Sequence, residues 1–347
     1  MASISQVTPV ETAQPTARTG YPESSLRFDW QMTGLSALFM AGLWVDGWAH
    51  FHGQTDNTFF TPWHFLFYSA FGIVALFLGY HQMQNTRRGY AFSRALPEGY
   101  WLSLLGVVLF GLGGVGDMIW HTLFGIEGGS EALTSPSHIM LALGMALVFS
   151  GPLRSAWKRS ASGEQRGWGQ LGPALIVTTL IFTLITFFVS YTHPVIDPAA
   201  AFRAGSRQDG GVTGILLMGV VMSGAMLTLV GRWRLPFGAM TLLLGGNVAL
   251  LVLLNDFFVL IPAALIPGLI ADVLLRFWPP TTSVRLYTFS FVVPLVYFIG
   301  YFMTIDLAAR IMWSVHVWTG AAFLAGVAGL LTALVMTHGP RLALPAE

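Results

Sequence analysis

Two short segments of the sequence carry the same arrangement of one aspartate and two histidines. Asp46, His50 and His64 form the first triad; the second triad comprises Asp117, His121 and His138. Asp117 and His121 each follow their counterparts by 71 residues, and His138 follows His64 by 74. A carboxylate and two imidazoles suit copper, zinc or iron better than magnesium or calcium, which favour all-oxygen coordination. The pattern therefore predicts metal binding by at least one triad.

The spacing within each triad predicts a helical hairpin. Each aspartate lies four residues before a histidine, so the two side chains share one face of a helix. Thr61-Pro62 and Ser135-Pro136 each place a good N-cap residue before a proline at the first helical position, so the last histidine lies in a first helical turn. The positive end of that helix dipole favours the neutral imidazole that binds metal.

The remainder of the sequence indicates a lipid bilayer as the solvent. The 347 residues are 54% hydrophobic and only 10% charged, whereas soluble domains are about 25% charged. Ten stretches are long and apolar enough to cross a hydrocarbon core of about 30 Å. Their expected limits are 30–52, 62–84, 98–124, 136–156, 168–192, 210–231, 236–258, 261–277, 285–306 and 311–336. We therefore predict an all-α, polytopic integral membrane protein, with the proline-containing eighth span a half-helix or kinked.

Composition also limits the partners. A net charge of +1 gives no indication of a nucleic-acid partner. The sequence has no cysteine, which excludes disulfides and thiolate metal sites. The expected partners are the lipid bilayer, other membrane subunits or a second copy of the chain, and a small or apolar substrate.

Basic residues in the loops predict the orientation in the membrane. They gather in the loops after the second, fourth, sixth and eighth spans, as Arg87, Arg88, Arg94, Arg154, Lys158, Arg159, Arg166, Arg232, Arg234, Arg276 and Arg285. The positive-inside rule makes these loops and both termini cytoplasmic. Both triads would then face the extracytoplasmic side of the cell membrane. The loop over 193–209 is a mild exception, because it carries Arg203 and Arg207 on that side.

The two hairpins would be parallel copies in an internal repeat, because two spans separate them. The repeats cover about 30–84 and 98–156. The chain then divides into a disordered tail over 1–27, a duplicated metal-binding region over 28–156, a bundle of about six helices over 168–336 and a tail over 337–347. Each hairpin could hold its own metal ion, or the two could face each other around one dinuclear centre. The sequence leaves both arrangements open.

The motif resembles one in the C subunit of the membrane copper monooxygenases, which oxidise methane, ammonia or short hydrocarbons. In that family a transmembrane Asp-x3-His and a later histidine bind copper. The segment from Asp56 to His64, Asp-Asn-Thr-Phe-Phe-Thr-Pro-Trp-His, is similar to the family's Asp-Thr-Asp-Phe-Thr-Pro-Ser-His. The resemblance implies copper ligands in the first triad and, through the repeat, in the second. It does not extend over 160–347, and the family subunit has fewer spans and one such site.

Five further residues are candidate ligands, namely His52, Glu127, His193, Asp272 and His316. On a helix His52 faces away from His50. Glu127 lies in a glycine-rich loop, where it could instead serve only to keep the loop soluble. His193 ends the fifth span as a gate or an extra ligand. Asp272 and His316 lie within spans, where charged groups are usually functional, although they could instead satisfy the backbone of the eighth span.

These observations favour an integral membrane metalloprotein with an outward-facing copper-type site. Its chemistry would be redox or oxygenase-like, on a small or apolar substrate, in the chain alone or in a complex. The alternatives are a copper acquisition or transport protein, a membrane zinc hydrolase and a haem-binding membrane protein, so iron, zinc and haem compete with copper. A buried hydrogen-bond network that holds two duplicated hairpins together would explain the same residues without a metal.

Overall fold

The computed structural model describes residues 18–54, 58–159, 165–198 and 208–337, and this part of the chain is all-α. Its α-helices are α1 (Leu26–Phe51), α2 (Pro62–Arg87), α3 (Trp101–Phe124), α4 (Ser130–Thr134), α5 (Pro136–Arg159), α6 (Gly167–Phe188), α8 (Gln208–Val230), α9 (Ala239–Asn255), α10 (Ile261–Phe277), α11 (Ser283–Ala309) and α12 (Val315–Thr337). Short 3-10 helices are η1 (Phe92–Arg94), η2 (Ser190–Thr192) and η3 (Phe258–Leu260). Most of the two expected tails, over 1–17 and 338–347, lies outside the described residues.

Each of the ten predicted spans overlaps one α-helix. The eight that are long and apolar enough to cross a membrane make the protein an integral membrane protein. The other two are α1 and α9. Helix α9 has 17 residues, as does α10, but α10 is extended to 20 apolar residues by the preceding η3. Helix α1 carries two acidic residues, Asp29 and Asp46, along its length. The eighth span is α10, an α-helix from Ile261 to Phe277 with Pro267 inside it.

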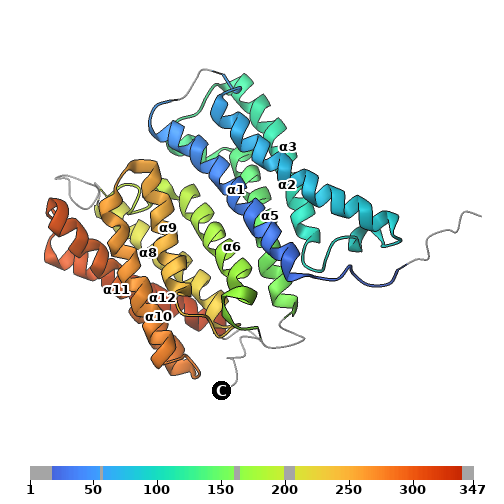
Figure 1. Ribbon diagram of the computed structural model, residues 1–347. Helices are drawn as coiled ribbons and strands as arrows, with labels where there is room; N and C mark the ends of the chain where they lie inside the picture. Colours follow the sequence, from blue (N-terminus) through green and yellow to red (C-terminus); the bar gives the residue numbers. More distant parts are fainter. Residues whose placement is uncertain (1–17, 55–57, 160–164, 199–207, 338–347) are drawn as a thin grey trace, which may run out of the picture.

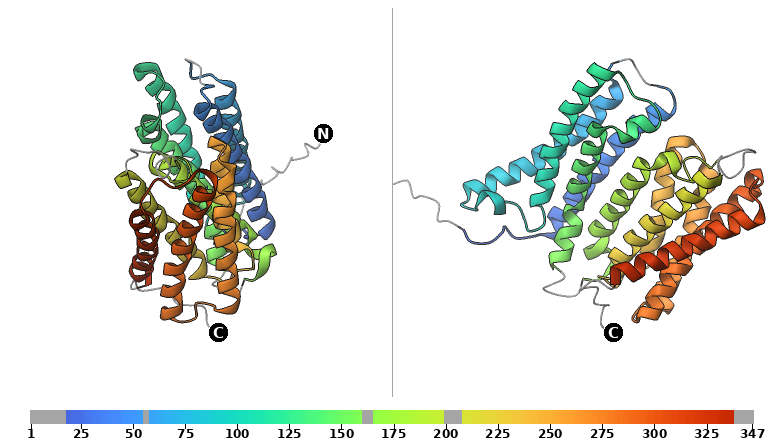
Figure 2. Two further views of the ribbon diagram at one scale, coloured as in Figure 1. Left: turned by 90° about the vertical axis from the view of Figure 1, so that its left-hand side faces the viewer. Right: turned by 180° about the vertical axis from the view of Figure 1, so that it is seen from behind.

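Helix α1 lies at the centre of the packing around the triads. It packs against α2, α5, α6 and α9, while α3 packs along α5. The remaining helices continue the bundle, with α10 between α9 and α11, and α12 between α11 and α8. Figures 1 and 2 show α1, α2, α3 and α5 side by side, with α6 and α9 on the other side of α1.

Small residues bring α3 and α5 unusually close. A Cβ atom on Gly106 would lie 2.6 Å from the carbonyl oxygen of Gly144, so only glycine fits at this contact. The glycine-rich stretch further along α3 also lies against neighbours, because a Cβ atom on Gly113 would lie 3.1 Å from Leu141. The glycines therefore act as a helix-packing surface, as expected for close contacts in membrane bundles.

A buried polar network ties the same helices together at the end remote from the triads. Asp29, in the first turn of α1, accepts a hydrogen bond of 2.6 Å from the Tyr100 hydroxyl at the start of α3. Arg159 at the end of α5 forms an ion pair with the same carboxylate. Asp46 lies 17 residues further along α1, about 26 Å away at 1.5 Å per residue. The network thus positions three helices without contributing to the triads.

Candidate metal centre

The first triad forms where α1 ends and α2 begins. Asp46 and His50 lie one turn apart near the end of α1, and the Nε2 atom of His50 is 4.0 Å from Oδ2 of Asp46. Thr61 caps α2, because its hydroxyl oxygen accepts a hydrogen bond of 3.1 Å from the backbone N–H of His64. This cap places His64 in the first turn, with its Nε2 atom 3.7 Å from Oδ1 of Asp46.

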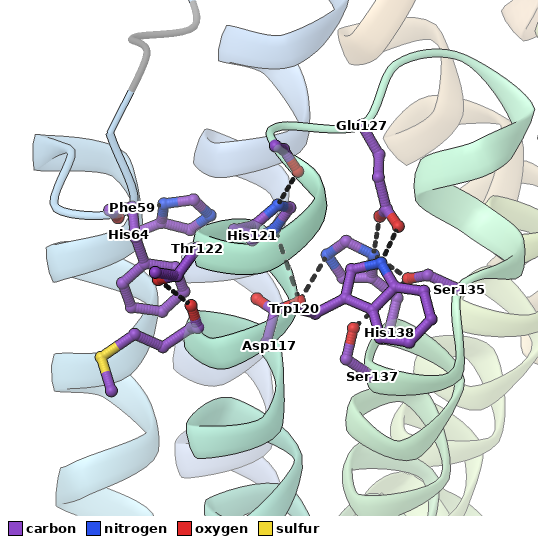
Figure 3. A network of polar contacts seen from close by, with 12 residues as sticks. Phe59, His64, Asp117, Trp120, His121, Thr122, Glu127, Ser135, Ser137 and His138 are labelled. Carbon is purple, nitrogen blue, oxygen red and sulfur yellow. Dashed lines mark hydrogen bonds and ion pairs between the residues drawn. The ribbon is translucent and has the colours of Figure 1, made fainter.

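The second triad forms between the end of α3 and the start of α5, at the same end of the bundle. Asp117 and His121 lie one turn apart on α3, and Nε2 of His121 is 3.5 Å from Oδ1 of Asp117. His138, in the first turn of α5, places its Nε2 atom 3.3 Å from the same oxygen. Figure 3 shows both imidazoles directed at the Asp117 carboxylate.

The spacing of these atoms fits a bound metal ion. In each triad one donor atom from each residue lies within 4.8 Å of the other two. Two ligands held about 2.0–2.1 Å from a tetrahedral metal ion are themselves about 3.3–3.4 Å apart. The imidazole–carboxylate separations of 3.3 and 3.5 Å in the second triad are close to that value. They exceed the roughly 2.7–3.2 Å of a good direct hydrogen bond.

One oxygen atom of each carboxylate lacks a hydrogen bond among the described residues. The Oδ1 atoms of Asp46 and Asp117 are buried without a hydrogen bond in the described part of the chain. Asp117 is 1% exposed and Asp46 is 8% exposed. A buried polar atom without a partner costs about 1–3 kcal/mol, and more when it is charged. Both imidazoles of the second triad lie beside Oδ1 of Asp117. In the first triad, His64 lies beside Oδ1 of Asp46 and His50 beside its Oδ2. A cation shared with the imidazoles would satisfy each carboxylate.

Hydrogen bonds on the far side of the rings select the form of the imidazole that binds metal. The Nδ1 atom of His64 lies 2.8 Å from the carbonyl oxygen of Phe59, and that of His121 lies 3.1 Å from the carbonyl oxygen of Gly125. A carbonyl only accepts hydrogen bonds, so each Nδ1 carries the proton. In the neutral ring Nε2 then presents a lone pair to a carboxylate oxygen. That arrangement is favourable only with a cation or a proton between the two atoms.

His138 is held by side chains instead. Its Nδ1 atom lies 2.7 Å from the hydroxyl oxygen of Ser135 and 3.3 Å from Oε2 of Glu127. Glu127 in turn accepts a hydrogen bond from the Trp120 indole (Figure 3). Glu127, one of the five additional candidates, therefore lies behind His138 and not on the side that faces Asp117.

The two triads open into one cavity of about 520 Å³. All six triad residues and Glu127 line it. The Asp46 carboxylate lies close enough to Asp117, His121 and His138 to interact with them electrostatically. The Phe59 ring stacks on His64 with centroids 5.1 Å apart, and its centroid lies 6.2 Å from that of His121. The triads thus face each other across a short distance, with Phe59 at their edge.

The rest of the cavity wall is mainly apolar. It is formed by side chains from α1, α2, α5, α6 and the loop after α6, among them Leu43, Phe67, Leu141, Met145, Phe187 and Ile196. This composition suits a small apolar molecule beside the triads.

Tyr68 is a cavity residue that sequence reasoning missed. Its hydroxyl is buried without a hydrogen bond in the part of the chain that the structure describes, although it lies beside the Asp117 carboxylate. Tyr68 belongs to α2, yet it contacts the second triad and so connects the two hairpins. The available signal was its spacing, because Tyr68 lies four residues after His64 and shares its helix face.

Two of the other candidate ligands, His52 and His193, have polar partners outside the triads, near the same end of the bundle. Nε2 of His52 lies 3.0 Å from Oδ2 of Asp256, and this hydrogen bond raises the pKa of His52. His193 is buried, with Nε2 3.1 Å from the sulfur of Met218. Its Nδ1 atom accepts a hydrogen bond from the backbone N–H of Val195. Neither histidine belongs to a metal-binding group among the described residues.

The candidates within the later spans are also placed apart from the triads. The Asp272 carboxylate accepts hydrogen bonds of 2.9 Å from the backbone N–H groups of Met240 and Thr241, and one of 2.7 Å from the Thr241 hydroxyl. It therefore caps the first turn of α9, where negative charge is favoured. His316 lies exposed in the first turn of α12.

Comparison of this chain with protein-family profiles, curated proteins and solved structures finds no match in any of the three. The assignment of function therefore depends on the geometry of the two triads and the cavity that they share.

Proposed function

We propose that this protein is an integral membrane metalloenzyme that holds copper in the two triads and oxidises a small apolar molecule in their shared cavity. The observation that carries the proposal is the convergence of two Asp-His-His groups, each with a buried carboxylate oxygen that lacks a partner, on one largely apolar cavity. Two metal ions would lie on facing walls, with the substrate beside them.

A parallel internal repeat explains why the groups are alike. The triads have the same residue order, nearly the same spacing and the same placement at a helix end and a following helix start. Duplication of one hairpin would produce this arrangement directly, and would direct both copies to the same side of the membrane.

The donor set supports copper. Imidazole nitrogens with a single carboxylate suit copper, iron or zinc. At a given site of this kind, Cu²⁺ forms more stable complexes than Fe²⁺ or Zn²⁺. The local resemblance of the hairpin turns to the copper monooxygenase subunit points to the same metal.

The proposed chemistry is insertion of oxygen into a C–H bond. Bound copper would supply one-electron redox chemistry with dioxygen. Overall, a hydrocarbon, dioxygen, two electrons and two protons yield an alcohol and water, with a quinol as the two-electron donor. Leu141 and Phe187 would hold the substrate by apolar contact, and the carbonyl groups behind His64 and His121 would keep both rings oriented.

The arrangement of charge supports an extracytoplasmic site. Arg87, Arg159 and Arg276 lie in the last turns of α2, α5 and α10. The triads lie at the opposite ends of α2 and α5. Basic residues favour the cytoplasmic side, so the cavity would face outward from the cell membrane.

Metal analysis of the purified full-length protein tests the proposal. Wild-type protein should retain two equivalents of copper, visible by EPR in the oxidised form. A variant with all six triad residues replaced by alanine should retain none, while replacement of the exposed residues Glu131 and His316 should change nothing. Equal metal contents in the six-residue variant and the wild type would overturn the proposal.

Activity of the loaded protein separates the remaining alternatives. With dioxygen, a quinol and a short alkane, we expect an alcohol to form in the wild type and not in the six-residue variant. Copper accumulation in proteoliposomes without turnover would indicate a carrier instead. Stoichiometric zinc in the purified protein would indicate a hydrolase, and a Soret band would indicate haem.

A further inference from the structure

The two triads differ in what lies behind their second histidine. In the first triad, Nδ1 of His64 donates a hydrogen bond to a neutral backbone carbonyl, that of Phe59. In the second, Nδ1 of His138 lies between the Ser135 hydroxyl and the Glu127 carboxylate. The difference comes from the segment between His121 and His138, which is three residues longer than the segment between His50 and His64.

Glu127 is held in this position although it belongs to a glycine-rich loop. Its side chain is 11% exposed, and its Oε1 atom accepts a hydrogen bond from the Trp120 indole on α3. Glu131, four residues later, is exposed. A loop carboxylate that served only solubility would be exposed to solvent, as Glu131 is. The burial of Glu127 therefore requires another explanation.

We infer that Glu127 is a positioning residue that makes the second triad the tighter of two unequal metal sites. The inference rests on the proposed function, since it assumes that both triads hold metal. A carboxylate behind a metal-bound imidazole fixes the ring and increases its basicity as a ligand. Glu127 also adds a second negative charge beside Asp117, so two carboxylates balance a divalent ion there, whereas the first triad contributes only Asp46.

The geometry of the two triads agrees with this order of affinity. The imidazole–carboxylate separations are 3.3 and 3.5 Å in the second triad, against 3.7 and 4.0 Å in the first. The side chains of Asp117 and His121 are 2% and 6% exposed, against 12% and 34% for Asp46 and His50. His138, at 21%, is more exposed than His64, at 12%. The second triad is therefore better prepared for an ion and better shielded from water, and the first is the position where metal exchanges.

Single-triad variants allow the inference to be tested with Cu²⁺ and Zn²⁺ alone. Asp46→Ala leaves only the second triad, and Asp117→Ala leaves only the first. In competition with a graded series of chelators, the Asp46→Ala protein should bind the ion more tightly than the Asp117→Ala protein. Adding Glu127→Gln should weaken binding by about 10–100-fold in the Asp46→Ala background. It should have no more effect than Glu131→Gln in the Asp117→Ala background.

Three further measurements separate positioning from a loss of folding. Trp120→Phe removes the donor to Glu127 and should weaken the second triad in the same direction. Glu127→Asp should restore part of the affinity that Glu127→Gln loses. The nitrogen hyperfine pattern in the EPR spectrum of the Asp46→Ala protein should change with Glu127→Gln, because the His138 ring is then held by Ser135 alone.

Three results would overturn the inference. Equal affinities of the two single-triad proteins would show that the sites are equivalent. An unchanged chelator titration or EPR spectrum after Glu127→Gln would remove the role of Glu127. A wild-type protein that binds neither ion above the six-residue variant would remove the proposed function as well, so the two failures are distinguishable.

Discussion

The Nε2 atom of His138 lies 3.3 Å from Oδ1 of Asp117, and that oxygen has no hydrogen bond within the described part of the chain. The other ring nitrogen of His138, Nδ1, lies next to the Ser135 hydroxyl and the Glu127 carboxylate. One imidazole is therefore placed between two carboxylates, and only one of these lies where an ion would bind. Under the proposed metal binding, we expect the stability of the protein to depend on metal, and side-chain substitutions test this expectation.

Asp117→Asn should change stability in opposite directions with and without metal. In metal-free protein the amide can donate to Nε2 of His138 and removes a buried, unpartnered charge, so the free energy of unfolding should rise by about 1–3 kcal/mol. In copper-loaded protein the substitution removes a ligand, so the same quantity should fall. Denaturant titrations in detergent, with and without chelator, measure both values.

A matched control for this reversal is Asp209→Asn, which changes an exposed carboxylate in the first turn of α8. It should leave stability nearly unchanged in both forms. A fall in stability for Asp117→Asn in the metal-free protein would show that the aspartate acts through a direct network with the histidines. That result would favour the purely structural explanation of the triad.

Gly114→Ala should disturb the site without altering any triad residue. A Cβ atom at Gly114 would lie 2.8 Å from Cε1 of Tyr68, so the Tyr68 ring must move within the cavity. We expect a shifted copper EPR spectrum and an affinity loss of about 10-fold, the low end for residues that support ligands. Gly116→Ala is the control, because nothing lies within 4 Å of its added Cβ atom. Identical spectra for both variants would show that Tyr68 does not influence the metal.

Much of the architecture around the triads could be predicted from sequence. Hydrophobic stretches of the required length have few alternatives in a bilayer, so the ten expected spans coincide with helices. The helix starts at Pro62 and Pro136 were also predictable, because proline is favoured in the first turn of a helix. The predicted side-chain cap is confirmed for Thr61, whereas the Ser135 hydroxyl lies against Nδ1 of His138. Both second histidines consequently lie in the first turns that the pattern indicates.

The contacts between helices could not be predicted in this way. Periodicity says which face of a helix is apolar but not which helix covers it, so the sharing of one cavity by both triads was left open. The same applies to Asp272, whose carboxylate caps α9 from a neighbouring helix. Its partners lie 32 and 31 residues away in the sequence, and no local pattern indicates them.

Asp272→Ala should weaken the fold and leave the metal content unchanged. The substitution removes three hydrogen bonds to a buried carboxylate at the start of α9. The loss of a helix cap costs about 0.5–2 kcal/mol, so the thermal midpoint should fall. Copper should remain at the wild-type stoichiometry in the folded fraction. A folded Asp272→Asn protein that loses copper or copper uptake would instead support a path for the ion through α10.

His193 should make the metal-free protein less stable as the pH falls. Burial lowers the pKa of His193 to about 3, against about 6.5 in an unfolded chain. Because the folded-state pKa is the lower one, the unfolded state binds the extra proton between these values. The free energy of unfolding is therefore unaffected by this residue above about pH 6.5. Below that pH it falls by up to about 1.4 kcal/mol per pH unit. His193→Leu should flatten the dependence of the thermal midpoint on pH between 7.5 and 5.0, whereas His316→Leu, at an exposed position, should not. Parallel curves for wild type and His193→Leu would show that the folded protein accepts the proton at this site.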